Sequence, residues 1–259
     1  MKKFVLFFVL SLSCLRGEGN EESVVCIHGF MTSARSMYPL KQALKDTEYS
    51  IYLWSYPSRR KTIEGSAQLL VCFLQDIACR KPGRTINFIT HSIGALVLRA
   101  ALNLPGCPQE AKMGRAALIA PPNKGSDLAR RFSQVSLIRM AMGSKSGQQL
   151  MTYTEKDIIC LGNFPECMKV LIIGGSEGST LWFNRPNDTF LAIDEIGLNT
   201  PYYWKTYPVT HGKLLKFKAI HNLIRLFFCD PFWEKNYPSL VSNPGFQSSS
   251  DLSSPERGG

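Results

Sequence analysis

The chain has 259 residues, of which 44% are hydrophobic and 19% charged, and this composition is typical of one globular domain with a sizeable core. The formal net charge is +10, but Lys and Arg are scattered, and the longest basic runs are residues 59–61 and 130–131. No zinc-knuckle, helix-turn-helix or aromatic-basic pattern occurs, so we expect no nucleic-acid partner. The charge indicates a basic surface that is compatible with peripheral contact with an anionic membrane. The oligomeric state stays open.

The first residues have the pattern of a signal peptide. Lys2 and Lys3 precede an apolar run from Phe4 to Leu12 that is too short to span a bilayer, and small residues follow it. We therefore predict a signal peptide over residues 1–19 and export to the periplasm, the outer membrane or the medium. A buried first strand is the alternative interpretation of this run. Lipidation of Cys14 stays open, because Ser11 stands where a lipoprotein signal has Leu.

Eight cysteines are present, and seven of them follow the predicted leader. Cys26 and Cys72 lie in apolar runs and are expected in the core. The other cysteines considered lie in or near loops, where a disulfide is conceivable in an oxidising compartment: Cys107, Cys160 and Cys167. No spacing is that of a zinc site, so we predict no metal.

The first predicted strand, residues 23–27, runs into His28-Gly29-Phe30. A strand that ends in His-Gly and a hydrophobic residue is typical of the loop that binds an oxyanion in acyl transfer. Gly29 lets the chain turn, and the amide of Phe30 is a candidate oxyanion donor. His28 is expected to brace this loop rather than to take part in the chemistry.

Strands and helices then alternate along the chain. The pattern predicts strands at 49–54, 85–89, 114–120, 168–175 and 202–207, and helices at 36–44, 63–78, 127–142 and 214–228, with a further helix after residue 94. Such alternation predicts an α/β fold with a mostly parallel sheet and helices on both faces. In these sheets, ligands bind at the carboxyl ends of the strands.

The most informative stretch is Thr90-His91-Ser92-Ile93-Gly94, between an apolar run and a helical pattern. Strand, tight turn with a central Ser, then helix is the context of a nucleophile elbow. We therefore predict Ser92 as the nucleophile and the amide of Ile93 as the second oxyanion donor. Gly94 provides the small residue that this turn needs, and His91 supports the turn.

Residues 127–165 lie between two sheet strands, where a small cap could be inserted over the site. Their Met and aromatic residues are expected mainly in core packing, with an acyl-binding wall as the alternative. We predict one α/β domain over residues 20–235. After it, residues 236–259 are rich in Ser, Pro and Gly, and we predict a disordered tail.

A Ser nucleophile needs an imidazole base and a carboxylate that orients it. His211 follows the last strand in a loop and is the predicted base, with His221 as the alternative. Asp188 is the predicted acid, followed by Asp194 and then Glu177. The order Ser, acid, His is that of the α/β-hydrolase arrangement.

These segments resemble bacterial α/β-hydrolases of the lipase and esterase type over roughly residues 24–228. The resemblance rests on residues 28–30, 88–94, 186–188, 208–211 and the fairly specific Pro-Pro-Asn-Lys-Gly-Ser run at 121–126. Ala95 and Thr189 depart from it, since both stand where Gly is common. The resemblance implies hydrolysis of an ester or lipid by Ser92, Asp188 and His211 without a cofactor.

Two other functions stay open. The same catalytic groups serve acyltransferases and thioesterases. An exported binding or surface protein that keeps the fold without activity is the alternative from another class.

Overall fold

The structure, a computed structural model, describes residues 21–143, 145–238 and 241–242. The predicted signal peptide at 1–19 and Cys14 lie outside the described residues, as does most of the predicted tail.

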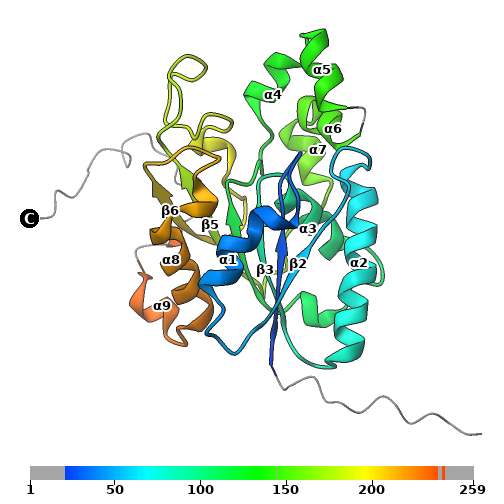
Figure 1. Cartoon of the computed structure of the whole chain (residues 1–259), viewed down its shortest axis with the longest axis vertical. Helices are drawn as coiled ribbons and strands as arrows, with labels where there is room; N and C mark the ends of the chain where they lie inside the picture. Colours follow the sequence, from blue (N-terminus) through cyan, green and yellow to red (C-terminus); the bar gives the residue numbers. More distant parts are fainter. Residues whose placement is uncertain (1–20, 144, 239–240, 243–259) are drawn as a thin grey trace, which may run out of the picture.

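A seven-stranded sheet with the order β2-β1-β3-β4-β5-β6-β7 forms the centre of the molecule (Figure 1). Its strands are β1 (Ser23–Ile27), β2 (Ser50–Trp54), β3 (Ile86–His91), β4 (Arg115–Ile119), β5 (Lys169–Gly175), β6 (Tyr202–Tyr207) and β7 (Val241–Ser242). The first six are parallel, and β7 is antiparallel to β6. All residues of β1 and β3 are buried, as expected for strands covered on both faces.

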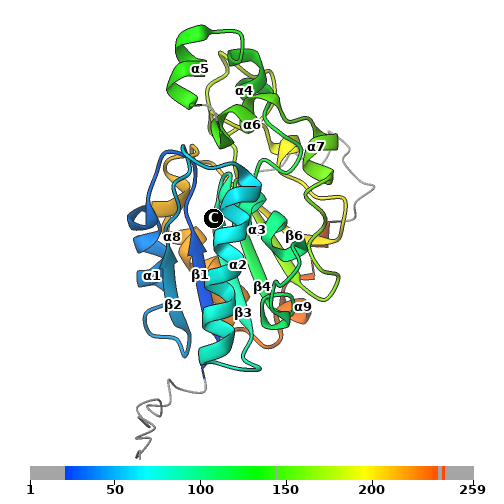
Figure 2. The ribbon, with the colours of Figure 1, turned by 90° about the vertical axis from the view of Figure 1, so that its right-hand side faces the viewer.

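Helices cover both faces of the sheet (Figure 2). On one face lie α1 (Tyr38–Ala43) and α8 (Lys218–Cys229), and on the other α2 (Ile63–Arg80) and α3 (Gly94–Asn103). The side chain of Thr62 caps α2, and the buried residues of this helix recur at helical spacing from Ile63 to Ile77. None of the helices in the described part of the chain is long and apolar enough to cross a membrane.

Four short helices lie beyond one end of the sheet, between β4 and β5. They are α4 (Asp127–Phe132), α5 (Ser136–Met142), α6 (Ser146–Thr152) and α7 (Glu155–Ile159), and both figures show α4, α5 and α6 as a layer above the sheet. They occupy the stretch 127–165 in which a cap was predicted. The chain enters this layer from the carboxyl end of β4, which is the edge where sites form in parallel sheets.

The predicted helix at 127–142 is wrong as one element, because it divides into α4 and α5. Val135 is extended, and the Ser133 hydroxyl donates to the Arg130 carbonyl at 2.6 Å, which closes the turn at the end of α4. Core packing was also wrong for the second part, since Leu137 and Met140 are 71% and 72% exposed. Leu128 on α4 is buried as expected.

The other corrections are smaller. The predicted helix at 214–228 begins with a separate 3-10 turn, Leu214–Lys216, before α8; further 3-10 turns lie at Ala34–Met37, Gln109–Ala111 and Ile193–Glu195. The tail was predicted to begin at residue 236. However, α9 (Trp233–Asn236) extends to residue 236, and the ring of Tyr237 stacks on that of Trp233. Strand β7 follows and pairs with β6, so the ordered chain continues past residue 236. Cys26 is buried, whereas Cys72 is exposed, and every cysteine from Cys26 to Cys229 is free.

Candidate active site

Ser92 lies at a strained turn between β3 and α3. Its φ of 53° is in the left-handed region, which is unfavourable for a residue with a side chain. The amide of Ser92 donates to the carbonyl of Ile119 in β4 at 2.9 Å, so the turn is held against the neighbouring strand. Strand β3 runs through His91, two residues beyond its predicted end. Backbone strain of this kind at a Ser between a strand and a helix is the geometry of a nucleophile elbow.

Gly94 is required by the close approach of this turn to the end of β1. A Cβ at Gly94 would lie 2.7 Å from the carbonyl oxygen of His28 and 2.9 Å from that of Ile27. Both neighbours are backbone atoms, which cannot rotate away. Ala95 stands where the resembling proteins commonly have a second Gly, and its methyl group is buried in the core on α3.

The loop after β1 lies against Ser92. A Cβ at Gly29 would lie 3.2 Å from Cβ of Ser92 and 2.8 Å from Nδ1 of His91, so only Gly fits without displacement. Among the described residues, no acceptor is found for the amide of Phe30 or for that of Ile93. Two unpaired amides, one in this loop and one directly after Ser92, are suitable donors to an oxyanion.

His28 holds this loop in place. Its ring is fully buried and stacks on the ring of Tyr56 at 4.4 Å between centroids. The amide of Tyr56 donates to Nε2 at 3.2 Å, so the proton is on Nδ1, which donates to the carbonyl of Gly29 at 2.8 Å. Burial lowers the pKa of His28, which keeps the imidazole neutral. His28 therefore ties the loop after β1 to the chain after β2.

Asp188 and His211 are brought together although 23 residues separate them. Oδ2 of Asp188 lies 2.6 Å from Nδ1 of His211, and the amide of His211 donates to the Asp188 carbonyl at 2.7 Å. The other carboxylate oxygen accepts from the amides of Phe190 at 3.0 Å and Leu191 at 2.8 Å. The carboxylate is buried, and these bonds fix its position.

The alternative residues lie elsewhere. The ring of His221 in α8 binds the carbonyl of Leu215. Asp194 forms an ion pair with Arg185 at 3.2 Å, and Glu177 is exposed. Of the three candidate acids, Asp188 is the one that contacts a histidine.

The ring of His211 lies beside the elbow. Its centroid is 4.7 Å from that of His91, the residue before Ser92, and 5.4 Å from that of Phe190. No hydrogen bond joins Ser92 to His211, although such bonds are often long in the absence of substrate. His91 is buried, and neither of its ring nitrogens has a hydrogen-bond partner among the described residues. Burial, followed by the charge of the neighbouring His211, lowers the pKa of His91 well below its usual value, so its imidazole is neutral.

Thr189, the residue after Asp188, has a φ of 95°. This backbone conformation suits Gly and is costly for Thr. The geometry explains why Gly is common at this position in the resembling proteins, and it shows that the chain keeps the same turn with a less suitable residue.

The segment 121–126 fastens the loop that carries Asp188. The side-chain amide of Asn123 donates to the carbonyl of Ile196 at 2.8 Å. The backbone amide of Lys124 donates to the carbonyl of Glu195 at 2.9 Å, and the hydroxyl of Ser126 donates to the carbonyl of Phe190 at 3.2 Å. These hydrogen bonds join the segment to residues 190–196.

Glu195 is a buried residue whose role the sequence did not indicate. Its carboxylate accepts from the amides of Asp127 at 2.5 Å and Ala192 at 2.7 Å, and Arg185 lies 3.9 Å away. Burial raises its pKa above the ordinary value of 4.5. Glu195 thereby joins the start of α4 to the loop that follows Asp188. An acidic residue in the apolar stretch 191–198 was the available signal.

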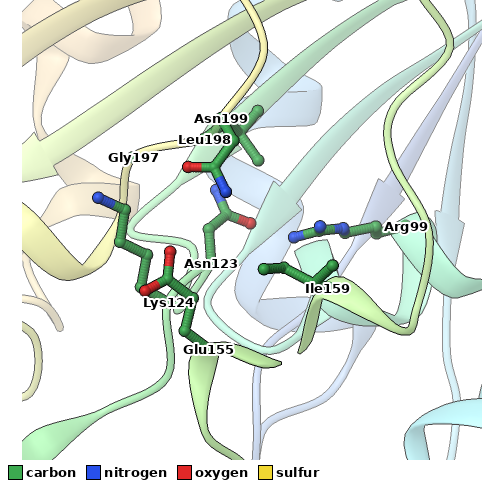
Figure 3. A pocket seen from close by; sticks show the side chains of 8 residues that line it. All are labelled: Arg99, Asn123, Lys124, Glu155, Ile159, Gly197, Leu198 and Asn199. Atoms are coloured by element: carbon green, nitrogen blue, oxygen red, sulfur yellow. The ribbon is translucent and has the colours of Figure 1, made fainter. Parts of the chain in front are cut away.

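A small cavity lies beside Asn123 (Figure 3). The side chains of Arg99 and Asn123 point into it from α3 and from the segment after β4, and Ile159 of α7 closes one side. None of the predicted site residues lines it. Among the described residues, no group of three or more His, Cys, Asp or Glu side chains is placed to hold a metal ion.

The fold is similar to those of several solved hydrolases. The mature form of lipase BlEst2 from Bacillus licheniformis aligns with a TM-score of 0.64 and 14% identity over 83% of this chain and 94% of that one. Its propeptide form gives a TM-score of 0.65, and there the chain spans about half of the longer protein, 51%.

Phospholipase PlaB from Legionella pneumophila aligns with a TM-score of 0.65 and 15% identity, over 85% of this chain and 62% of that chain. A metagenomic carboxyl esterase, MGS0156, aligns with a TM-score of 0.59 and 17% identity, over 74% and 65% of the two chains. No protein-family model matches the chain, and no curated protein matches it in sequence. Together with the sheet and its helices, these similarities establish the predicted α/β-hydrolase fold.

Proposed function

We propose that the chain is a serine hydrolase that cleaves carboxylic esters through an acyl-enzyme. The observation that carries this proposal is the 2.6 Å contact between Asp188 and His211, with the His211 ring packed beside the elbow of Ser92. The fold shared with lipases and esterases supports it.

The roles follow from the contacts. Nδ1–H of His211 donates a hydrogen bond to the Asp188 carboxylate, which leaves Nε2 unprotonated and able to take the Ser92 proton. The Ser92 oxygen then attacks the ester carbonyl. The amides of Phe30 and Ile93 bind the oxyanion, and His211 returns the proton to the leaving alcohol. Water, activated by the same imidazole, releases the acid in the second half of the reaction.

The surroundings of the site favour an apolar acyl group. Phe190 is 58% exposed and packs against His211, and Met31, next to Phe30, is 56% exposed. Exposed apolar side chains beside His211 and in the loop after β1 are suitable contacts for an acyl chain. The substrate we propose is therefore an ester with a hydrocarbon acyl group, as in short esters or lipids.

Hydrolysis of p-nitrophenyl esters with short and long acyl chains tests this function. Wild type should turn over, and Ser92→Ala should lower kcat by about 10⁴-fold or more, because the members of a triad act as a unit. A fluorophosphonate should label wild type and not the variant. Equal activity of the two proteins would place the nucleophile elsewhere. An inert, unlabelled wild type that is folded would favour the binding-protein alternative.

A further inference from the structure

His91 differs from the other histidines in how its ring is bonded. It ends β3 directly before Ser92 and is buried, and neither ring nitrogen has a hydrogen-bond partner among the described residues. By contrast, His28 bonds through both nitrogens, and His211 and His221 each bond through one. A buried polar group without a partner destabilises a fold, so such a group calls for a functional explanation.

The ring of His91 lies between the loop after β1 and the predicted base. A Cβ at Gly29 would lie 2.8 Å from Nδ1 of His91, so the ring packs directly against this loop. Its centroid is 4.7 Å from that of the His211 ring, and the two planes are inclined by 46°. The contact with Gly29 leaves the ring no room to move away from His211 on that side.

Two titratable side chains of the described chain face the ring of His211. The carboxylate of Asp188 lies 2.6 Å from Nδ1, and the imidazole of His91 lies against the ring. The third neighbour, Phe190, is apolar. Burial lowers the pKa of His91, followed by the charge of His211 and then by that of His28. His91 therefore stays neutral when His211 takes up a proton.

The proposed reaction places a positive charge beside this neutral ring. Transfer of the Ser92 proton makes His211 an imidazolium, which Asp188 stabilises from the side of Nδ1. A neutral imidazole has a proton on one nitrogen and a lone pair on the other. Because no hydrogen bond from a described residue fixes the tautomer of His91, the more stable one is that with its lone pair nearer the cation. Such a dipole acts strongly in a buried site.

We propose that His91 is a positioning residue whose neutral imidazole stabilises the protonated form of His211 during acyl transfer. This inference rests on the proposed hydrolase function. His91 acts through His211 and takes no proton from Ser92. Its unpaired nitrogens weaken the folded state, so stability and activity should respond differently when they are removed.

Two substitutions separate this role from simple packing, both in the full chain. His91→Leu keeps a buried side chain of similar size without polar atoms. His91→Gln keeps a neutral dipole at the same position. The control is Ser66→Ala, which removes from α2 a buried hydroxyl that also has no partner among the described residues.

His91→Leu should lower kcat by about tenfold with little change in KM, because the imidazolium is absent from the ground state. The acid limb of its kcat/KM profile should move about one unit to lower pH, which is the same factor expressed as a protonation equilibrium. Its melting temperature should equal or exceed that of wild type. His91→Gln should recover kcat to within about threefold of wild type. Ser66→Ala should keep both its melting temperature and its full kcat.

A titration by NMR tests the coupling of the two rings without catalysis. The ring protons of His211 are followed in Ser92→Ala and in the same protein with His91→Leu. The titration midpoint should be about one pH unit lower in the second protein. An unmoved midpoint overturns the proposal whatever the rate, and a joint fall of kcat and melting temperature with it makes His91 a packing residue.

The same measurements separate this inference from the hydrolase function. If the midpoint moves but wild type cleaves no ester, the hydrolase function fails, and with it the role of His91 in that reaction. If wild type cleaves esters and His91→Leu matches it in rate and in midpoint, the inference about His91 alone fails.

Discussion

Asp188→Asn tests whether Asp188, rather than Asp194 or Glu177, orients the ring of His211. In the structure, one carboxylate oxygen accepts from the amides of Phe190 and Leu191, and the other faces Nδ1 of His211. An Asn at this position can keep its oxygen on the two amides, which puts its NH₂ group opposite Nδ1. Because that group is a donor, it favours the imidazole with the proton on Nε2, the nitrogen that must accept the proton of Ser92.

The expected loss is therefore large in activity and small in stability. A reversed tautomer in a triad lowers kcat by about 10⁴-fold, which corresponds to about 5.5 kcal/mol in the activation free energy. Two of the three side-chain hydrogen bonds persist, so the free energy of unfolding should fall by only about 1–2 kcal/mol.

The assay is the initial rate on a saturating p-nitrophenyl ester, alongside thermal unfolding of the same samples. Asp194→Asn and Glu177→Gln are the matched controls, and both should keep the rate within about threefold, since neither side chain contacts a histidine. The reasoning is refuted if Asp188→Asn keeps more than a tenth of the wild-type rate in folded protein. An equal loss in Asp194→Asn would also refute it.

Two further predictions concern the loop that carries the acid. Thr189→Gly should raise the free energy of unfolding by about 1 kcal/mol, because the strain relieved at a φ of 95° exceeds the entropy that the more flexible Gly loses on folding. A lower melting temperature than that of wild type would contradict this account. Glu195→Gln tests the raised pKa of Glu195: the unfolded chain loses this proton at lower pH than the folded one, so the stability of wild type relative to the variant should fall as pH rises above 4.5. The measurement is the melting temperature of both proteins from pH 4 to pH 8, a range of about four units. If burial of the carboxyl has no such effect, the two plots of melting temperature against pH will be parallel.

Local pattern was sufficient to predict the strands of the sheet and the strand, turn and helix around Ser92. The strands around Val25 and Phe88 are continuous apolar runs, and their covering helices have a buried stripe, so their type follows from neighbouring residues alone. The turn at Ser92 lies between one such strand and one such helix, and its strain arises within the same few residues.

The division of residues 127–142 into two helices was not predictable in this way. Their spacing of apolar residues is helical throughout, and the break depends on a hydrogen bond from Ser133 and on which residues find a surface to pack against. Leu128 finds one in the layer above the sheet, whereas Leu137 does not.

The sequence by itself determined the α/β fold, the turn at Ser92 and the set of candidate acids, because each depends on side chains close in the chain. Tertiary structure alone placed Asp188 against His211, bound the buried carboxylate of Glu195 to the amide of Asp127, and joined Ser58 to Ser146. These pairs are 23 to 88 residues apart. Their contacts depend on how strands order in the sheet and how loops close at its carboxyl edge, and no local periodicity records that geometry.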